Sequence, residues 1–153
     1  MRRIGITGGI GSGKSVVSRL LRIMGYSVYD TDSEAKRLME SSLEVVQKLS
    51  ECFGRDIYHN GRLNRGLLSS RVFGESDKIV LLNSIVHPVV RFDFYRWSES
   101  LNEEICFVES AILYESRFDE LVDEVWTVTA PEELRISRVR QRSGCLLYTS
   151  PSP

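Results

Sequence analysis

Residues 8–15 read Gly-Gly-Ile-Gly-Ser-Gly-Lys-Ser and match the pattern G-x-x-x-x-G-K-[ST]. This pattern constrains the fold more than any other part of the chain, because it is found between a strand and a helix. Residues 3–7 form a strand-like run, and residues 16–24 carry apolar side chains at helical spacing before Gly25. The chain is therefore predicted to begin with a strand, a glycine loop and a helix.

The residue types in this loop suit phosphate binding. Glycines let the loop curl so that backbone N–H groups converge on phosphate oxygens, and the following helix adds its positive N-terminal dipole. Lys14 would reach the β- and γ-phosphates of ATP, and the Ser15 hydroxyl would coordinate Mg²⁺. ATP and Mg²⁺ are therefore the expected cofactors. The predicted ATP-binding residues are Gly8, Gly11, Ser12, Gly13, Lys14, Ser15 and Val16.

Two acidic residues follow the second predicted strand, residues 26–29. Asp30 and Asp32 come at its carboxyl end, where open α/β sheets bind their ligands. A carboxylate there can accept the proton of an attacking hydroxyl or help to hold Mg²⁺, and we predict that Asp32 does so. The run from Thr31 to Glu34 also matches a helix capping box, which would make Asp32 a favourable first-turn acid. Both interpretations stay open, and they are compatible.

Residues 33 to about 100 are predicted to be mostly helical and to lack a core strand. Asn60-Gly61 indicates a turn, and Asn64 and Ser76 are expected to cap helices over residues 65–73 and 77–86. A predicted apolar stripe comprises Leu43, Val46, Leu49 and Phe53. We interpret this region as a helical subdomain inserted into the α/β fold.

His87-Pro88 is expected to break the chain, with Pro88 at the first position of a new helix. At such a helix start, His87 would either bind a substrate phosphate or cap the helix locally. The residues themselves do not decide between these roles.

The α/β pattern returns after residue 104, with predicted strands at residues 105–108 and 125–129. Glu109 follows the first of them and is a candidate ligand of Mg²⁺, directly or through water, although an acid there can be incidental. Pro131 is expected to open a helix that carries four arginines, Arg135, Arg138, Arg140 and Arg142. We predict that Arg138 and Arg142 neutralise transition-state charge; the alternative is a solvated helix face.

Charge and cysteine content narrow the protein class. The chain has 20 basic and 21 acidic side chains in 153 residues, so no net field attracts it to nucleic acid or to an anionic membrane. Neither guanine-nucleotide motif, D-x-x-G or N-K-x-D, occurs, which argues against a regulatory GTPase. Three widely spaced cysteines, no signal peptide and no apolar run of about 18 residues predict a cytoplasmic protein. The oligomeric state cannot be predicted.

Residues 143–153 differ in composition from the rest, because they contain no charged side chain and end in Ser-Pro-Ser-Pro. We predict a non-native tail here, so that the native α/β sequence is truncated after about residue 142. A genuine flexible tail is the alternative.

Several motifs taken together resemble the dephospho-CoA kinase family. The resemblance runs from residue 1 to about residue 142. The phosphate loop alone is not specific to this family, but its combination with the two aspartates and the His-Pro pair is more specific. The motifs lie at residues 6–15, 30–32, 61–65, 72–73, 82–88, 109–116 and 138–142. Departures include Asn64 for a frequent Asp, and Ser143 where the family has an acidic residue.

This resemblance implies a three-layer P-loop fold with a parallel sheet and an inserted helical subdomain. The kinase core would comprise residues 1–32 and 104–142, and residues 33–103 would bind the CoA substrate. The implied activity is ATP-dependent phosphorylation of the ribose 3′-hydroxyl of dephospho-CoA, the last step of coenzyme A synthesis. Asp32 would be the base, His87 part of the CoA-side pocket, and Arg138 and Arg142 the start of a lid, with Lys14 assisting catalysis. The alternatives are another small-metabolite or nucleoside monophosphate kinase, and a catalytically silent nucleotide-binding module.

Overall fold

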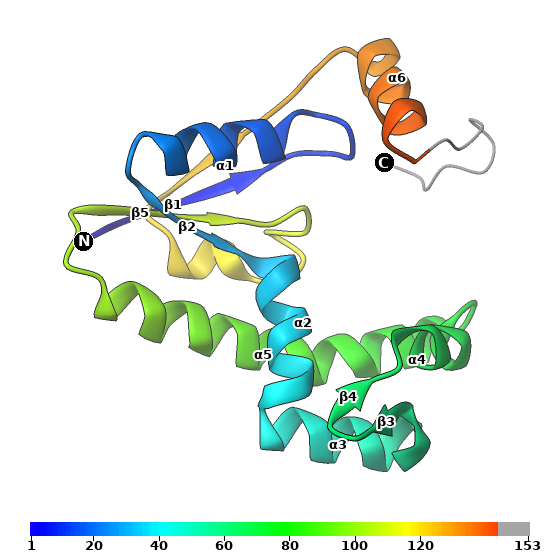
Figure 1. Cartoon of the computed structure of the whole chain (residues 1–153). Coiled ribbons are helices and arrows are strands. Elements are labelled where there is room, and N and C mark those ends of the chain that lie inside the picture. Colours follow the sequence, from blue (N-terminus) through cyan, green and yellow to red (C-terminus); the bar gives the residue numbers. More distant parts are fainter. Residues whose placement is uncertain (144–153) are drawn as a thin grey trace. The chain divides into compact units, whose positions relative to one another are not determined.

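The computed structural model describes residues 1–143 (Figure 1). The chain divides into two compact units. The first comprises Met1–Asp30 and the chain from Ser98 onward, and the second comprises Thr31–Trp97. The first unit contains the phosphate loop, and the second begins directly after the second strand. The predicted tail lies outside the described residues, apart from the end of the last helix.

The first unit is built on a four-stranded parallel sheet in the order β2-β5-β1-β6. Neighbours in this sheet are not neighbours in sequence, so the connections cross over from strand to strand, as the predicted α/β pattern requires. The parallel α/β fold predicted from the sequence is confirmed. The strands are β1 (Arg2–Thr7), β2 (Ser27–Asp30), β5 (Ile105–Glu109) and β6 (Glu124–Thr127).

Side chains alternate along β1 and pack on both faces of the sheet. On one face, Ile4 and Ile6 form a buried cluster with Phe107 and with Leu21 of α1 (Lys14–Ile23), which lies along the sheet in Figure 1. On the other face, Gly5 lies against the buried Leu113, where an added Cβ would come within 2.6 Å of the leucine Cδ1. The segment carrying Leu113 leads into a short 3₁₀ helix, η2 (Phe118–Leu121). The core therefore fills both sides of β1 and fixes the strand that leads into the phosphate loop.

The second unit is mainly helical, as predicted. Its elements are α2 (Thr31–Ser41), α3 (Leu43–Phe53), η1 (Arg55–Ile57), β3 (Tyr58–His59), β4 (Arg62–Leu63), α4 (Arg65–Val72) and α5 (Ser76–Ser100), which runs on into the first unit. The predicted turn at Asn60-Gly61 joins β3 to β4, and both of its residues have positive φ. The predicted cap at Asn64 is confirmed, because its side chain accepts a hydrogen bond from the Leu67 N–H at 3.0 Å.

The predicted apolar stripe of α3 is wrong at its first position. Leu43 is 86% exposed, whereas Val45 and Leu49 are fully buried and Phe53 is nearly so. Ser42 caps the helix by accepting a hydrogen bond from the Val45 N–H, so the buried face follows positions 45, 49 and 53. Leu43, two positions before Val45, consequently faces solvent.

The predicted chain break at His87-Pro88 is also wrong, because Pro88 lies inside the continuous helix α5. An interior proline removes one backbone hydrogen bond and costs about 3 kcal/mol. Burial of an aliphatic or aromatic side chain contributes roughly 1.5–3 kcal/mol. Four buried residues on both sides of Pro88 therefore outweigh it: Ile85, Val86, Val90 and Phe94. His87 is a mid-helix residue and not the start of a new helix.

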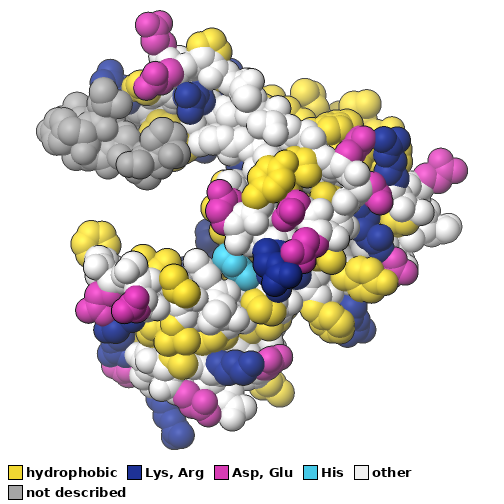
Figure 2. Space-filling view, turned by 180° about the vertical axis from the view of Figure 1, so that it is seen from behind, with side chains coloured by type: hydrophobic (Ala, Val, Ile, Leu, Met, Phe, Trp, Pro, Cys, Tyr) yellow, Lys and Arg dark blue, Asp and Glu magenta, His cyan; other side chains and the backbone are white. Residues whose placement is uncertain are grey.

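The predicted arginine helix is present as α6 (Glu132–Ser143), which begins directly after Pro131. Among residues 1–143 we find no helix that combines the length and the apolar character needed to cross a membrane. On the face shown in Figure 2, acidic and basic side chains are interspersed, as the nearly neutral net charge leads one to expect.

Candidate active site

The phosphate loop, residues 8–13, joins β1 directly to α1 in the first unit. Gly11 and Gly13 have φ values of +73° and +101°, which side-chain-bearing residues rarely adopt. A Cβ on Gly8 would lie 2.5 Å from the carbonyl oxygen of Val128 and 2.6 Å from Ser12 Oγ. The loop is therefore packed so tightly that its conformation depends on glycine at these positions.

One polar atom in this loop is left without a partner. Ser12 is only 4% exposed, and its Oγ has no hydrogen-bond partner among the described residues. A buried hydroxyl without a partner is unfavourable, so an orphaned donor in a glycine loop at a helix N-terminus indicates an anionic ligand. Ser15 and Val16 lie in the exposed first turn of α1. The loop fits the phosphates of a nucleotide.

Lys14, the first residue of α1, is paired with the acid at the end of β5. Its Nζ lies 3.5 Å from Glu109 Oε1, and both side chains are largely buried. Glu109 is in register with Ile6 of β1 and with Asp30 of β2, so two carboxylates stand side by side at the carboxyl edge of the sheet. The structure thus brings together the predicted lysine and the predicted metal-binding acid.

The oxygen-bearing residues near the loop suit an Mg²⁺ ion that is shared with a nucleotide, and not a metal ion held by protein side chains alone. In the part of the chain that the structure describes, no group of three or more His, Cys, Asp or Glu side chains is arranged to hold a metal ion. Mg²⁺ is commonly bound by one or two protein oxygens together with substrate phosphates and water. Ser15 and Glu109 can supply such oxygens, so the site fits Mg²⁺ bound with a nucleotide.

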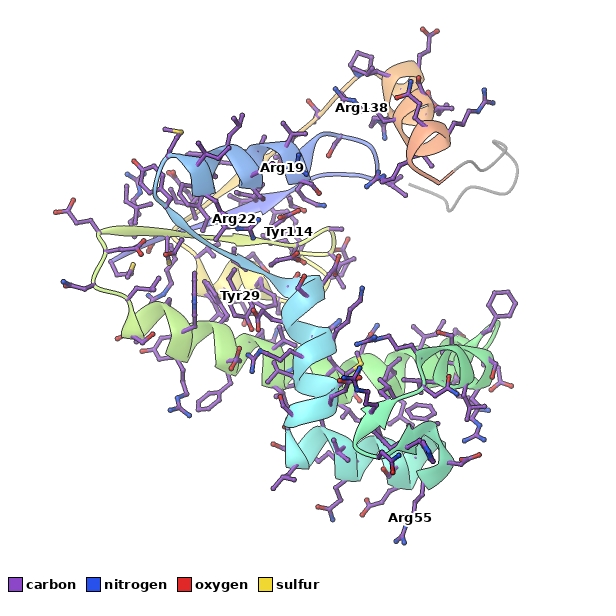
Figure 3. All side chains as sticks on the ribbon, viewed as in Figure 1. Arg19, Arg22, Tyr29, Arg55, Tyr114 and Arg138 are labelled. Carbon is purple, nitrogen blue, oxygen red and sulfur yellow. The ribbon has the colours of Figure 1, made fainter. Side chains whose placement is uncertain are left out.

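Helix α6 lies against the phosphate loop. The Nη1 of Arg138 donates a hydrogen bond of 3.1 Å to the carbonyl oxygen of Gly11, and Figure 3 shows Arg138 on the side of α6 toward the loop. Arg135 also contacts the loop, a role that the sequence analysis did not assign to it. Its spacing of three residues from Arg138 was the available signal, because residues i and i+3 share a helix face. Arg142 lies one turn beyond Arg138 and is exposed.

The other two predicted site residues belong to the second unit. Asp32 is exposed in the first turn of α2, two residues after the end of β2. Arg37 on the same helix forms ion pairs with Glu34 and with Asp93 of α5, and the second of these pairs links α2 to α5. Burial, and secondarily the charge of Arg91, lowers the pKa of His87 below its usual 6.5. The roles of Asp32 and His87 stay predictions.

A phosphate loop after the first strand of a parallel sheet, with the motif lysine at the start of the next helix, defines a P-loop nucleotide-binding protein. The family model for dephospho-CoA kinase matches residues 2–147. The dephospho-CoA kinase of Porphyromonas gingivalis is 47% identical over 144 residues, which cover 94% of this chain and 71% of the relative. The chain therefore belongs to the dephospho-CoA kinase family, and the predicted resemblance is confirmed.

Two solved structures support the same fold. The TT1252 protein of Thermus thermophilus has a TM-score of 0.80 and is 36% identical; the match covers 96% of this chain and 75% of that one. The dephospho-CoA kinase of Campylobacter jejuni has a TM-score of 0.69 at 22% identity, covering 97% of this chain and 76% of that one. At that identity the second likeness bears on the fold alone.

Proposed function

We propose that this protein transfers the γ-phosphate of ATP to the ribose 3′-hydroxyl of dephospho-CoA, giving coenzyme A and ADP. The observation that carries the proposal is the phosphate loop with Lys14 and Glu109 paired beneath it, in a chain of this family. The family match favours dephospho-CoA over a nucleoside monophosphate or another small metabolite as the acceptor. It also favours an active kinase over a silent nucleotide-binding module.

The residues of the first unit would hold the phosphate donor. Backbone N–H groups of the loop and the Ser12 hydroxyl bind phosphate oxygens, and the Lys14 ammonium neutralises charge on the β- and γ-phosphates. When bound, Mg²⁺ would be held by Ser15 and by Glu109, directly or through water, and would stabilise the charge that develops on the phosphates. Arg138 and Arg142 add positive charge from α6. Catalysis then rests on positioning and charge stabilisation.

Asp32 would act on the acceptor. Its carboxylate accepts the proton of the 3′-hydroxyl as that oxygen forms a bond to the γ-phosphorus. The bond from the γ-phosphorus to the β–γ bridging oxygen breaks, and ADP leaves with the electron pair. Asp32 and His87 would contact dephospho-CoA in the second unit. The position of Asp32, two residues after the carboxyl end of β2, supports this role.

We place this reaction in the cytoplasm. The cysteines within residues 1–143 are free thiols, the exposed Cys52 and the buried Cys106, and a protein that keeps an exposed thiol suits a reducing compartment. The nearly neutral net charge supports a small-molecule substrate over nucleic acid or a membrane surface.

A panel of phosphate acceptors tests the proposed function. ADP release is measured with dephospho-CoA, with each nucleoside monophosphate and without acceptor, and phosphorus NMR of the product locates the new phosphomonoester. We expect turnover with dephospho-CoA and a product phosphorylated on the ribose 3′-oxygen. Lys14→Ala serves as the control for nucleotide-dependent turnover. A preference for a nucleoside monophosphate would overturn the assignment of the acceptor.

A further inference from the structure

The backbone of helix α6 lies close to the phosphate loop. A Cβ on Gly11 would lie 2.5 Å from the carbonyl oxygen of Arg135 and 3.0 Å from its Cα. The backbone of Arg135 therefore rests on the bare face of Gly11. This contact sets the position of the helix and of every side chain on the same face.

The side chain of Arg135 is directed along the loop. Its Nε donates a hydrogen bond of 3.1 Å to the carbonyl oxygen of Ala130, and its Nη1 lies 3.5 Å from the position of a Cβ on Gly9. Arg138 faces the other half of the loop, because its Nη1 bonds to Gly11 and lies 3.3 Å from the Cβ position of Gly13. The two guanidinium groups thus flank the loop at its beginning and at its end.

Both guanidinium groups are held by neutral carbonyl oxygens. Within residues 1–143, neither Arg135 nor Arg138 forms an ion pair with a carboxylate, whereas Lys14 is paired with Glu109. Two positive charges without a carboxylate partner, beside a glycine loop at a helix N-terminus, favour an anion between them. Arginine suits this task because its planar group can donate two hydrogen bonds to one phosphate.

We propose that Arg135 is a further phosphate-binding residue of the nucleotide site, contacting the ATP phosphates from the Gly9 side while Arg138 contacts them from the Gly11 side. This proposal depends on the proposed function in one respect, because it takes ATP as the bound nucleotide. The bond to Ala130 holds the Arg135 guanidinium in place before the nucleotide arrives, which lowers the loss of side-chain entropy on binding. Arg135 is thus part of the ATP site and not of the solvated face of α6.

The test is calorimetric titration of the chain with Mg·ATP in the absence of an acceptor. Arg135→Gln keeps an N–H donor near the position of Nε for the bond to Ala130 but removes the guanidinium group and its charge. Arg140→Gln makes the same change at an exposed position of the same helix and is the matched control. We expect Arg135→Gln to weaken Mg·ATP binding about tenfold and to reduce its dependence on ionic strength, with Arg140→Gln within about twofold of wild type.

Equal affinities of the two variants would overturn the proposal, and so would weaker binding with an unchanged salt dependence, which indicates a structural role. If Arg135→Gln lowers the melting temperature, Arg135→Lys distinguishes a role in phosphate binding from a structural role. Because Arg135→Lys keeps the positive charge, it must retain more Mg·ATP affinity than Arg135→Gln. An equal loss of affinity in the two variants would overturn the proposal. The titration contains no dephospho-CoA. A chain that binds ATP through Arg135 but phosphorylates another acceptor would therefore overturn the proposed function and leave this inference standing.

Discussion

The contact between Gly11 and α6 can be tested by adding a single methyl group. Gly11 and Gly74 have nearly identical φ values, +73° and +74°, but a Cβ on Gly74 meets nothing within 4 Å. An alanine in this conformation costs about 1–2 kcal/mol in either place. For a chain of this size, each kcal/mol lowers the melting temperature by roughly 2–4 °C. Gly74→Ala therefore controls for backbone strain.

Gly11→Ala has a second effect that the control lacks. Its methyl group would lie 2.5 Å from the Arg135 carbonyl oxygen, so α6 or the loop must move by about 1 Å to restore an ordinary contact. Such a shift lengthens the 3.1 Å bond from Arg138 to Gly11 beyond hydrogen-bonding distance and withdraws both arginines from the loop. Loss of one charge-assisted contact weakens binding roughly ten- to a hundredfold.

Mg·ATP titration and thermal melting of the two variants give the comparison. We expect both to melt below wild type, with Gly74→Ala binding Mg·ATP normally and Gly11→Ala at least about tenfold more weakly. If Gly11→Ala binds Mg·ATP as tightly as Gly74→Ala, the packing of α6 on the loop is not required for nucleotide binding and the reasoning is refuted.

Three further predictions concern the second unit. Hydrogen bonds from Arg71 lower the pKa of Asp56 below 3.8, so their stabilisation is present above that pH and is lost as the pH falls below it. The difference in melting temperature between wild type and Arg71→Ala should shrink as the pH is lowered toward 3. A difference that stays constant with pH would contradict the role of Asp56. Burial lowers the pKa of His87, so the neutral imidazole contributes stability above pH 6.5, and this stability is lost as the pH falls. His87→Gln should therefore reduce the change of melting temperature with pH below pH 6.5. An unchanged pH profile of the melting temperature would contradict the prediction. Pro88→Ala should raise the free energy of unfolding by about 3 kcal/mol in urea titration, because it removes the cost of an interior proline, whereas no change would point to a helix that begins at residue 88.

The parts of the fold that the sequence predicted well depend on local chemistry. The glycine loop, the Asn64 cap and the Asn60-Gly61 turn are determined by backbone conformation and nearby hydrogen bonds, and these act within a few residues. The parallel sheet was predicted from the alternation of strand-like and helix-like patterns along the sequence. The errors at Leu43 and Pro88 arose where tertiary packing decides which face is buried and whether a proline is tolerated.

The site was predictable to the extent that motifs carry it. The loop residues, Lys14 and Glu109 could be named from strand ends and residue types, but their 3.5 Å pairing required the register of β1 and β5. The spacing of three residues indicates that Arg135 shares a helix face with Arg138, but it does not indicate what that face contacts. Its contact with Gly11 joins residues 124 positions apart, and sequence spacing within α6 contains no information about that approach.

Turnover of Asp32→Asn tests the central claim most directly. ADP formation with dephospho-CoA and Mg·ATP affinity are measured on the same preparations of wild type and variant. We predict that the rate falls by about 10²–10⁴-fold while Mg·ATP affinity stays unchanged, because the amide cannot accept the hydroxyl proton. Unchanged turnover in Asp32→Asn would contradict the assignment of Asp32 as the base, and absence of dephospho-CoA phosphorylation by the wild-type chain would contradict the proposed reaction itself.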